Sequence, residues 1–478
     1  MCDLPKMEKM KMSQNNKFNK VLNPWDVLVT AFGAMIGWGW VVSTGGWLSR
    51  AGVAGTVLGF VIGGIMIYFV GLTYAELTTA MPVVGGERVF SLKAFGPTGS
   101  FICTWFLVLS YVGVVCFEAC SLPTVIQYIF PGFLKGYLYT IAGFDVYATW
   151  LVVGIICALS ITYVNIRGIK AAAALQTVLT IIIAAVGLVL VAVSVLKGTP
   201  ANLNNGQFHG NNTVESIKNI LSVAVIAPFF LFGFDVIPQV AEEIKVPLKK
   251  LGWLMLLSIV LAVAFYGLVV FAVGYVMSPQ DVNNSLSSSG LVTADAMAKA
   301  FSSDSMSKVL ILGGICGIIT SWNSFMIGGS RALFSMSEAH MLPSFFCKLS
   351  SKKTPINALI FVGVLSIISL FLGRSALIWI SDTASLACCI AYCMVSMSFL
   401  VLRRKEPELK RPYKVKRHIL VGSIATIMSA IMVLLYLIPG SGCTLSREEW
   451  SIACVWILLG IIMYAVAKSK YKSQFGKN

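Results

Sequence analysis

Two glycine-interrupted apolar stretches are the part of this sequence best suited to bind a small solute. The first reads Gly-Ala-Met-Ile-Gly-Trp-Gly-Trp over residues 33–40, and the second reads Phe-Phe-Leu-Phe-Gly-Phe-Asp over residues 229–235. Glycine disfavours a regular helix, and unwound peptide groups at membrane depth survive only where protein or a polar cavity covers them. We therefore predict two broken membrane helices that build a binding site near the middle of the membrane. The alternative is that these glycines only permit close helix packing.

The two breaks offer opposite kinds of polar group. Freed N–H groups at Gly37, Trp38 and Gly39 could hold a carboxylate, helped by the positive end of the half-helix that follows. Freed carbonyl groups near Phe232 and Gly233 suit an ammonium group or another cation. The pair of breaks therefore favours a ligand that carries both a negative and a positive charge.

Ionisable residues inside apolar stretches are costly and are therefore candidates for function. Glu118 is the least expected of them, and it could pair with a substrate amine or carry a proton. The alternative is a carboxylate at the outer end of a span that reaches water. Asp235 directly follows the second break, where a role in gating or proton sensing is predicted. For Glu76 and Asp382 we favour structural hydrogen bonding.

Thr320 and Ser321 are candidates for ion coupling. Their hydroxyl groups could complete a sodium site with carbonyl oxygens of the first break, since hard cations prefer oxygen ligands. Such residues in spans more often bond back to their own helix. No charged residue lies between Lys170 and Lys197 in the fifth apolar segment. Coupling to Na⁺, coupling to H⁺ through Glu118 and pure exchange all stay open, and no other cofactor or metal is predicted.

The elements that carry these residues are membrane helices. The chain has 478 residues, is 57% hydrophobic and 12% charged, and so has about half the charged fraction of a typical soluble domain. At about 20 apolar residues per span, twelve segments are expected. Their centres lie near residues 37, 65, 110, 156, 184, 228, 264, 320, 363, 389, 428 and 459. The predicted class is an all-α integral membrane protein with five plus five inverted segments and two more.

The net charge of +16 reflects membrane topology rather than nucleic-acid binding. With a cytoplasmic N terminus, 28 of the 36 Lys and Arg residues fall on the inner side, which predicts that both termini are cytoplasmic. The densest cluster lies between residues 403 and 417, where lipid binding is an alternative role. The first 20 residues contain no apolar h-region, so no cleaved signal peptide is expected.

The predicted organisation is one integrated membrane domain. It comprises a cytoplasmic tail (1–22), a transporter core of ten helices (23–405), helices eleven and twelve (406–468) and a second cytoplasmic tail (469–478). Outer loops are expected near 197–217 and 278–306, with a short helix over residues 291–297 above the outer mouth. The last two helices are expected at the periphery, where a homo-oligomer contact is conceivable.

Six motifs in the expected order resemble the amino acid–polyamine–organocation superfamily of permeases, which has the LeuT-type fold. They are the first break, Tyr74-Ala75-Glu76-Leu77, Pro82-Val83-Val84-Gly85-Gly86, Asn165-Ile166-Arg167-Gly168, Gly233-Phe234-Asp235 and Ser330-Arg331-Ala332-Leu333-Phe334. The resemblance runs from about residue 23 to 405. It departs from the family at Trp38, where a small residue is common, and this departure bears on the substrate.

The resemblance implies residue roles that composition alone does not supply. Ile36, Gly37, Trp38 and Gly39 would bind substrate together with Phe229, Phe232, Gly233 and Glu118. By similarity to the arginine–agmatine antiporter, Phe229 falls at an aromatic gate, Phe232 at a pocket wall and Trp322 at a distal gate. Asp235 is a further gate candidate.

The expected function is secondary transport of an amino acid across the plasma membrane by alternating access, either ion-coupled or by exchange. An amine such as ethanolamine or a polyamine is the alternative substrate, favoured by Trp38, Trp40 and Glu118 as partners for a cation. A non-transporting membrane sensor is a third reading. No nucleophile constellation is present, so an enzyme is not expected. The predicted partners are a small-molecule substrate and the lipid bilayer.

Overall fold

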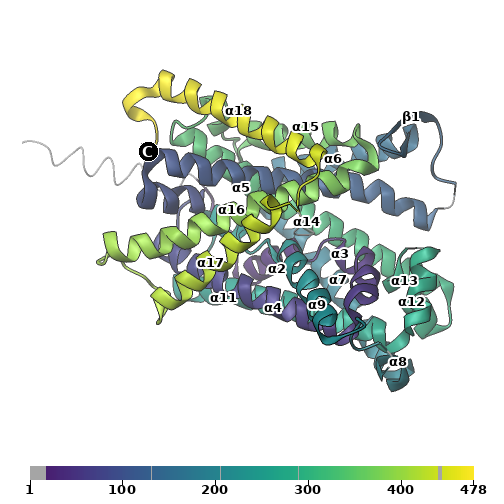
Figure 1. The fold of residues 1–478 in the computed structure, drawn as a ribbon. Helices are drawn as coiled ribbons and strands as arrows, with labels where there is room; N and C mark the ends of the chain where they lie inside the picture. The colour runs from purple at the N-terminus through teal and green to yellow at the C-terminus, as the bar shows by residue number, and fades with distance from the viewer. Residues whose placement is uncertain (1–17, 131, 205, 289, 440–443, 478) are drawn as a thin grey trace, which may run out of the picture.

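A computed structural model describes residues 18–130, 132–204, 206–288, 290–439 and 444–477, and most of this chain is helical (Figure 1). The helices are α2 (Pro24–Met35), α3 (Gly39–Val42), α4 (Thr44–Ala80), α5 (Gly86–Ile129), α6 (Ala148–Ile166), α7 (Ile169–Lys197), α8 (Pro200–Asn204), α9 (Thr213–Leu231), α10 (Val236–Gln239), α11 (Leu248–Val276), α12 (Pro279–Ser287), α13 (Val292–Phe301), α14 (Asp304–Glu338), α15 (Ile356–Leu370), α16 (Ala376–Lys405), α17 (His418–Leu437) and α18 (Arg447–Tyr471). Short 3-10 turns are η1 (Ala241–Glu243), η2 (Ser344–Cys347), η3 (Gly373–Ser375) and η4 (Lys472–Gln474). An antiparallel hairpin is formed by β1 (Tyr137–Ile141) and β2 (Phe144–Tyr147).

The first apolar segment is broken where its glycines predict. Helix α2 starts at a capping box. The Asn23 side chain accepts hydrogen bonds from N–H groups of the first turn, and the Asp26 side chain accepts one from the Asn23 N–H. The helix ends at Met35, and regular geometry resumes only at Gly39. The residues between, Ile36 to Trp38, are unwound.

The second break lies against the first. Helix α9 ends at Leu231, and α10 begins at Val236. Between them Gly233 has a φ of +140°, which L side chains rarely adopt. A Cβ atom built on Gly233 would lie 2.7 Å from Cβ of Ala34 and 3.1 Å from the backbone nitrogen of Met35. The absence of a side chain at Gly233 therefore lets the second break lie against the last residues of α2.

Ten helices of the described chain are long and apolar enough to cross a membrane, which confirms the all-α membrane class. Twelve segments were expected. The break divides the first of these into pieces too short to count, and α15 has 15 residues. Sharp turns at Gly52 (φ +75°) and Gly96 (φ +78°) let α4 and α5 each contain two helices in sequence. The inverted repeat stays a prediction.

The two ends of the helix bundle differ in structure. The chain's C terminus and the loop between α16 and α17 lie at one end, here named the basic end (Figure 1). The hairpin, α8, α12 and α13 lie at the other, here named the hairpin end. The short helix predicted over residues 291–297 is present as α13. Its Thr293 hydroxyl donates to the carbonyl of Trp40 at 3.0 Å, so α13 is tied to α3.

Buried ion pairs hold the basic end together. Arg331 on α14 pairs with Glu243 of η1 at 2.9 Å, and both side chains are 1% exposed. Glu76 on α4 accepts hydrogen bonds from Arg403 (2.6 Å) and from the Val415 N–H (2.7 Å), and it pairs with Arg411. The structural role predicted for Glu76 agrees with these contacts. Helices α17 and α18 lie on the outside of the bundle, α17 against α16 and α4 and α18 against α16 and α5.

Candidate functional site

A cavity lies beside the two breaks, about 30 Å³ measured as the space open to the centres of water molecules. It is bounded by the first break, the end of α9 and side chains of α5, α11 and α14. The lining residues include Gly37, Trp38, Gly39, Glu118, Phe229, Phe230, Phe232, Tyr266, Ser321 and Phe325. The structure thus brings together Gly37, Trp38, Gly39, Glu118, Phe229 and Phe232 from the predicted substrate set, together with Ser321 from the ion-coupling candidates.

The unwound N–H groups beside the cavity have no hydrogen-bond acceptor among the described residues. They belong to Gly37, Trp38 and Gly39. Three neighbouring donors without partners are unusual in buried backbone, because an unpaired buried N–H is costly. They form an arrangement that a carboxylate could satisfy.

Glu118 approaches the same backbone from α5. A Cβ atom built on Gly37 would lie 2.6 Å from Oε1 of Glu118 and 3.4 Å from Oγ of Ser321. The Glu118 side chain is 2% exposed, so it does not reach bulk water in this conformation. Its Oε2 atom has no hydrogen-bond partner among the described residues, and no Lys or Arg lines the cavity. A carboxylate in this setting calls for a cationic ligand or a proton.

The unwound carbonyl groups face α14 on the other side of the break. A Cβ atom on Gly317 would lie 2.5 Å from the carbonyl oxygen of Gly37 and 2.9 Å from that of Ile36. The Thr320 hydroxyl donates to the Gly317 carbonyl at 3.0 Å. This is the bond back to its own helix that the sequence analysis gave as the alternative to a sodium site. Thr320 and Ser321 therefore stand near the freed carbonyls, and Ser321 also lines the cavity.

Neutral side chains of α7 occupy the region next to Thr320. A Cβ atom built on Gly33 would lie 2.6 Å from Oγ1 of Thr180 and 3.4 Å from Cβ of Thr320. Gln176 accepts a hydrogen bond from Asn323 at 2.8 Å. Helix α7 thus meets the first broken helix with an amide and a hydroxyl, in line with the absence of charge in this segment.

Aromatic rings from three helices surround the cavity. Phe229 contacts Phe232 (5.5 Å between ring centroids) and Phe117 of α5 (6.1 Å), and Phe232 contacts Phe325 of α14 (5.2 Å). Phe229 lines the cavity, and the gating role that the resemblance implies for it stays a prediction.

The tryptophans of the first break and α14 point in different directions. Trp38 lines the cavity, and its ring lies against Gly314, where a side chain would collide with it. Trp40 is fully buried against Phe265 (5.4 Å) and does not line the cavity. Trp322 is also fully buried, and it lies outside the cavity lining.

Asp235 supports the second break rather than lining the cavity. Its Oδ1 atom accepts the N–H of Gly233 at 2.7 Å, and its carbonyl oxygen accepts the hydroxyl of Tyr111 at 2.8 Å. Among the described residues, its Oδ2 atom and the hydroxyl of Tyr392 have no hydrogen-bond partner. This buried polar cluster joins α5, α16 and the second break.

Sequence reasoning did not select Tyr111, Tyr266 or Tyr392. Tyr266 of α11 donates to the carbonyl of Met35 at 3.0 Å and so satisfies a group freed where α2 ends. The available signal was a tyrosine within an apolar segment, whose hydroxyl must find a partner when buried.

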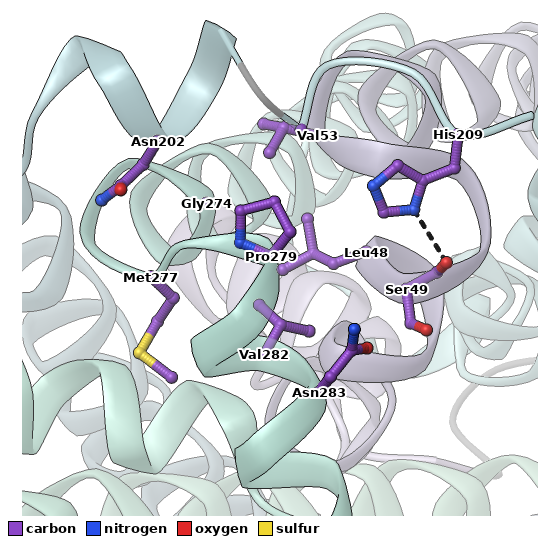
Figure 2. Close-up of a pocket in the computed structure, with 11 residues that line it drawn as sticks. Leu48, Ser49, Val53, Asn202, His209, Gly274, Met277, Pro279, Val282 and Asn283 are labelled. Carbon is purple, nitrogen blue, oxygen red and sulfur yellow. Dashed lines mark hydrogen bonds between the residues drawn. The ribbon is translucent and has the colours of Figure 1, made fainter.

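A second cavity lies at the hairpin end, away from the breaks. Figure 2 shows Leu48, Val53 and Pro279 among its lining residues and the His209 ring directed at Ser49. Nδ1 of His209 lies 2.8 Å from the Ser49 carbonyl, and the N–H of Val53 donates to Gly206. These contacts fasten the loop before α9 to the turn at Gly52. No group of three metal-binding side chains occurs in the described chain.

Comparison with known proteins identifies the family. The family model described as amino acid permease matches residues 22–463. The chain is 26% identical to the branched-chain amino acid permease BcaP of Bacillus subtilis (strain 168), covering 96% of this chain and 95% of the relative. It is 25% identical to the methylthioribose transporter of the same organism (96% and 95%) and 26% identical to its glutamate/serine transporter AimA (97% and 84%). This multi-pass membrane protein belongs to the amino acid permease family and is a transporter rather than an enzyme.

Proposed function

We propose that this protein carries an α-amino acid across the plasma membrane by alternating access. The observation that carries the proposal is the meeting of three N–H donors without protein partners (Gly37, Trp38 and Gly39) with the buried carboxylate of Glu118. An α-amino acid bears a carboxylate and an ammonium group on one carbon, so it could bind the N–H donors and the Glu118 carboxylate at the same time. The N–H groups would bind the carboxylate, and Glu118 would bind the amine.

The aromatic residues would enclose the substrate's side chain. Phe229 and Phe232 form part of the cavity wall, and the cavity has room for about two water molecules in this conformation. An amino acid would therefore require the surrounding rings to move. We assign gating to Phe229, with Trp322 and Asp235 acting on the neighbouring helices, as rocking of broken helices around a fixed site requires.

Either of two coupling ions would find candidate ligands beside the first break. Sodium would use the carbonyl oxygens near Ile36 and Gly37 together with the hydroxyls of Thr320 and Ser321. A proton would use Glu118. Exchange of one amino acid for another needs neither. The termini are proposed to be cytoplasmic, because most of the Lys and Arg residues fall in the segments on the side of the membrane that the termini are expected to share.

An amine without a carboxylate is the second candidate substrate. The buried carboxylate of Glu118, with no cation in the cavity, favours it. The three N–H donors would then remain without a partner, which is why the amino acid is preferred. The relatives are named for substrates that range from branched-chain amino acids to methylthioribose, so membership of the family does not fix the substrate's side chain.

A ligand screen of the purified protein tests the proposal. Thermal unfolding would be measured with each of the twenty amino acids and with ethanolamine, putrescine, agmatine and γ-aminobutyrate, in sodium or choline buffer. A ligand at 100 times its Kd stabilises the folded state by about 2.7 kcal/mol. Stabilisation by one or a few α-amino acids supports the proposal, and a sodium requirement identifies the ion. Stabilisation by amines alone would exclude carboxylate binding at Gly37 and Gly39.

A further inference from the structure

A groove between α6 and α15 is larger than the substrate cavity. Its volume is about 370 Å³ on the measure that gives about 30 Å³ for the substrate cavity. Its walls are apolar side chains that face away from the bundle: Leu159, Tyr163, Ile166, Ile360, Val364 and Ile367. Leu159, Ile360 and Val364 are between 45% and 55% exposed, so the groove opens to the membrane.

The floor of the groove is formed by close contact between the two helices. A Cβ atom on Gly363 would collide with the hydroxyl of Thr162, so the missing side chain at Gly363 lets α15 approach α6. The Thr162 hydroxyl donates to the carbonyl of Ala158 at 2.7 Å. The hydroxyl group of Thr162 is therefore hydrogen-bonded within α6 and needs no polar partner in the groove. The floor of the groove thus suits a hydrocarbon chain.

A cationic end distinguishes this groove from an ordinary lipid-facing surface. Arg167 directly follows α6 at the basic end, and its Nη1 donates to the hydroxyl of Tyr163 in the groove wall at 3.1 Å. Its guanidinium lies 5.8 Å from the centre of the Tyr163 ring. Arg167 pairs with no carboxylate in the part of the chain that the structure describes. The Lys352 side chain lies 3.7 Å from the Cβ position of the adjacent Gly168.

We propose that this groove binds a phospholipid with an anionic headgroup. One acyl chain would lie along α6 and α15, and the phosphate would contact Arg167 and Lys352. The guanidinium fork matches phosphate geometry, and Tyr163 holds it above the groove. The groove's cationic end lies at the basic end of the bundle, so its lipid would come from the leaflet that the topology places at the cytoplasm, where anionic lipids are enriched.

Native mass spectrometry of the delipidated full-length protein tests this site. Dioleoylphosphatidylglycerol and the zwitterionic dioleoylphosphatidylcholine would be titrated separately, and the tightest binding step measured. Arg167→Gln removes the charge, and Arg404→Gln is the matched control at another exposed arginine of the same end. Val364→Trp fills the groove, and Ile368→Trp, on the same helix and 55% exposed outside the groove, is its control.

The expected result is preferential binding of the anionic lipid. Arg167→Gln should weaken that binding roughly fivefold and leave the neutral lipid unaffected, since one cation near a lipid surface contributes about that factor. Val364→Trp should weaken both lipids, and the two controls should bind as the native protein does. If Val364→Trp does not fold, Ile360→Trp fills the same groove.

Several results would overturn the proposal. They are equal affinity for the two lipids, equal effects of Arg167→Gln and Arg404→Gln, or equal effects of Val364→Trp and Ile368→Trp. Competition by glycerol phosphate as strong as that by the intact lipid would show a free-phosphate site. A lipid-free dimer that Val364→Trp disrupts would show that a second copy of the chain covers the groove.

Discussion

Gly37 is the residue on which the proposed site depends most closely. Its missing side chain lets the unwound backbone lie beside Glu118, because an added Cβ would stand 2.6 Å from Oε1. We expect Gly37→Ala to displace that carboxylate and to weaken substrate binding at least tenfold, since small misplacements of bound groups carry large costs. The readout is the Kd from ligand-dependent thermal stabilisation, together with uptake into vesicles.

The matched control for this substitution is Gly46→Ala. No heavy atom lies within 4 Å of a Cβ built on Gly46, so an alanine meets open space there. Unchanged binding in Gly37→Ala would mean that the substrate lies elsewhere, whereas equal losses in both variants would point to a general fold defect.

Glu118 should determine the affinity for the ligand's amine. Glu118→Gln keeps the shape of the side chain and removes its charge. Because a hydrogen bond to a charged group contributes about 1.5–3 kcal/mol, we expect amino acid affinity to fall by roughly 10- to 100-fold. Calorimetry on the purified protein would measure it, with the exposed Glu408→Gln as control. A Glu118→Gln variant with native affinity would remove Glu118 from the substrate site.

The cavity's residues were predictable only where the signal is local. Glycines at a break and a carboxylate in an apolar segment are visible in sequence, so Gly37, Gly39 and Glu118 could be selected. Tyr266 could not, because its role depends on which side of α11 faces the first break. Trp40 was predicted, like Trp38, to be a partner for a cation. Helix α3 begins at Gly39, between the two, and Trp40 packs against Phe265 instead.

At the scale of elements, the segment after the second break is fixed to α14 by one buried ion pair. Removing one partner leaves an uncompensated charge, so Arg331→Met or Glu243→Gln should each lower the free energy of unfolding by about 3 kcal/mol. The double variant Arg331→Met with Glu243→Gln should lose less stability than the sum of the two single variants. Unfolding in mixed detergent micelles measures these differences.

An exposed pair on the same molecule provides the comparison. Lys93 and Glu406 are 2.8 Å apart but 38% and 35% exposed, so Lys93→Met should change the stability by less than about 1 kcal/mol. Equal effects at the two pairs would show that burial of Arg331 and Glu243 does not matter, and would contradict this account of the basic end.

Element boundaries show where sequence patterns lose information. Periodicity and length identified the long spans, and they placed α13 within its loop. The hairpin of β1 and β2 was not foreseen. Its turn uses Ala142 and Gly143, both with positive φ (+47° and +80°), instead of the Asn-Gly pair that usually marks such turns. The turns at Gly52 and Gly96 were likewise not predicted, because the sequence around each shows no long polar segment that would separate two helices.

Across the whole molecule, the charged clusters and the hairpin lie at opposite ends of the helix bundle (Figure 1). The buried pairs of Glu76 and Glu243, the basic loop after α16 and the C terminus share one end, and the hairpin lies at the other. The distribution of Lys and Arg predicts that the basic end faces the cytoplasm, because the translocation of basic loops is disfavoured.

Reporter fusions test this orientation directly. Alkaline phosphatase folds only outside the cytoplasm, so a fusion after residue 143, in the hairpin turn, should be active. The same reporter at the C terminus should be inactive, and green fluorescent protein fused there should be fluorescent. The reverse pattern at both sites would place the basic end outside the cell and would invert the proposed orientation of the transporter in the membrane. It would also remove the cytoplasmic leaflet as the source of the lipid at Arg167, so a single topology experiment bears on both proposals.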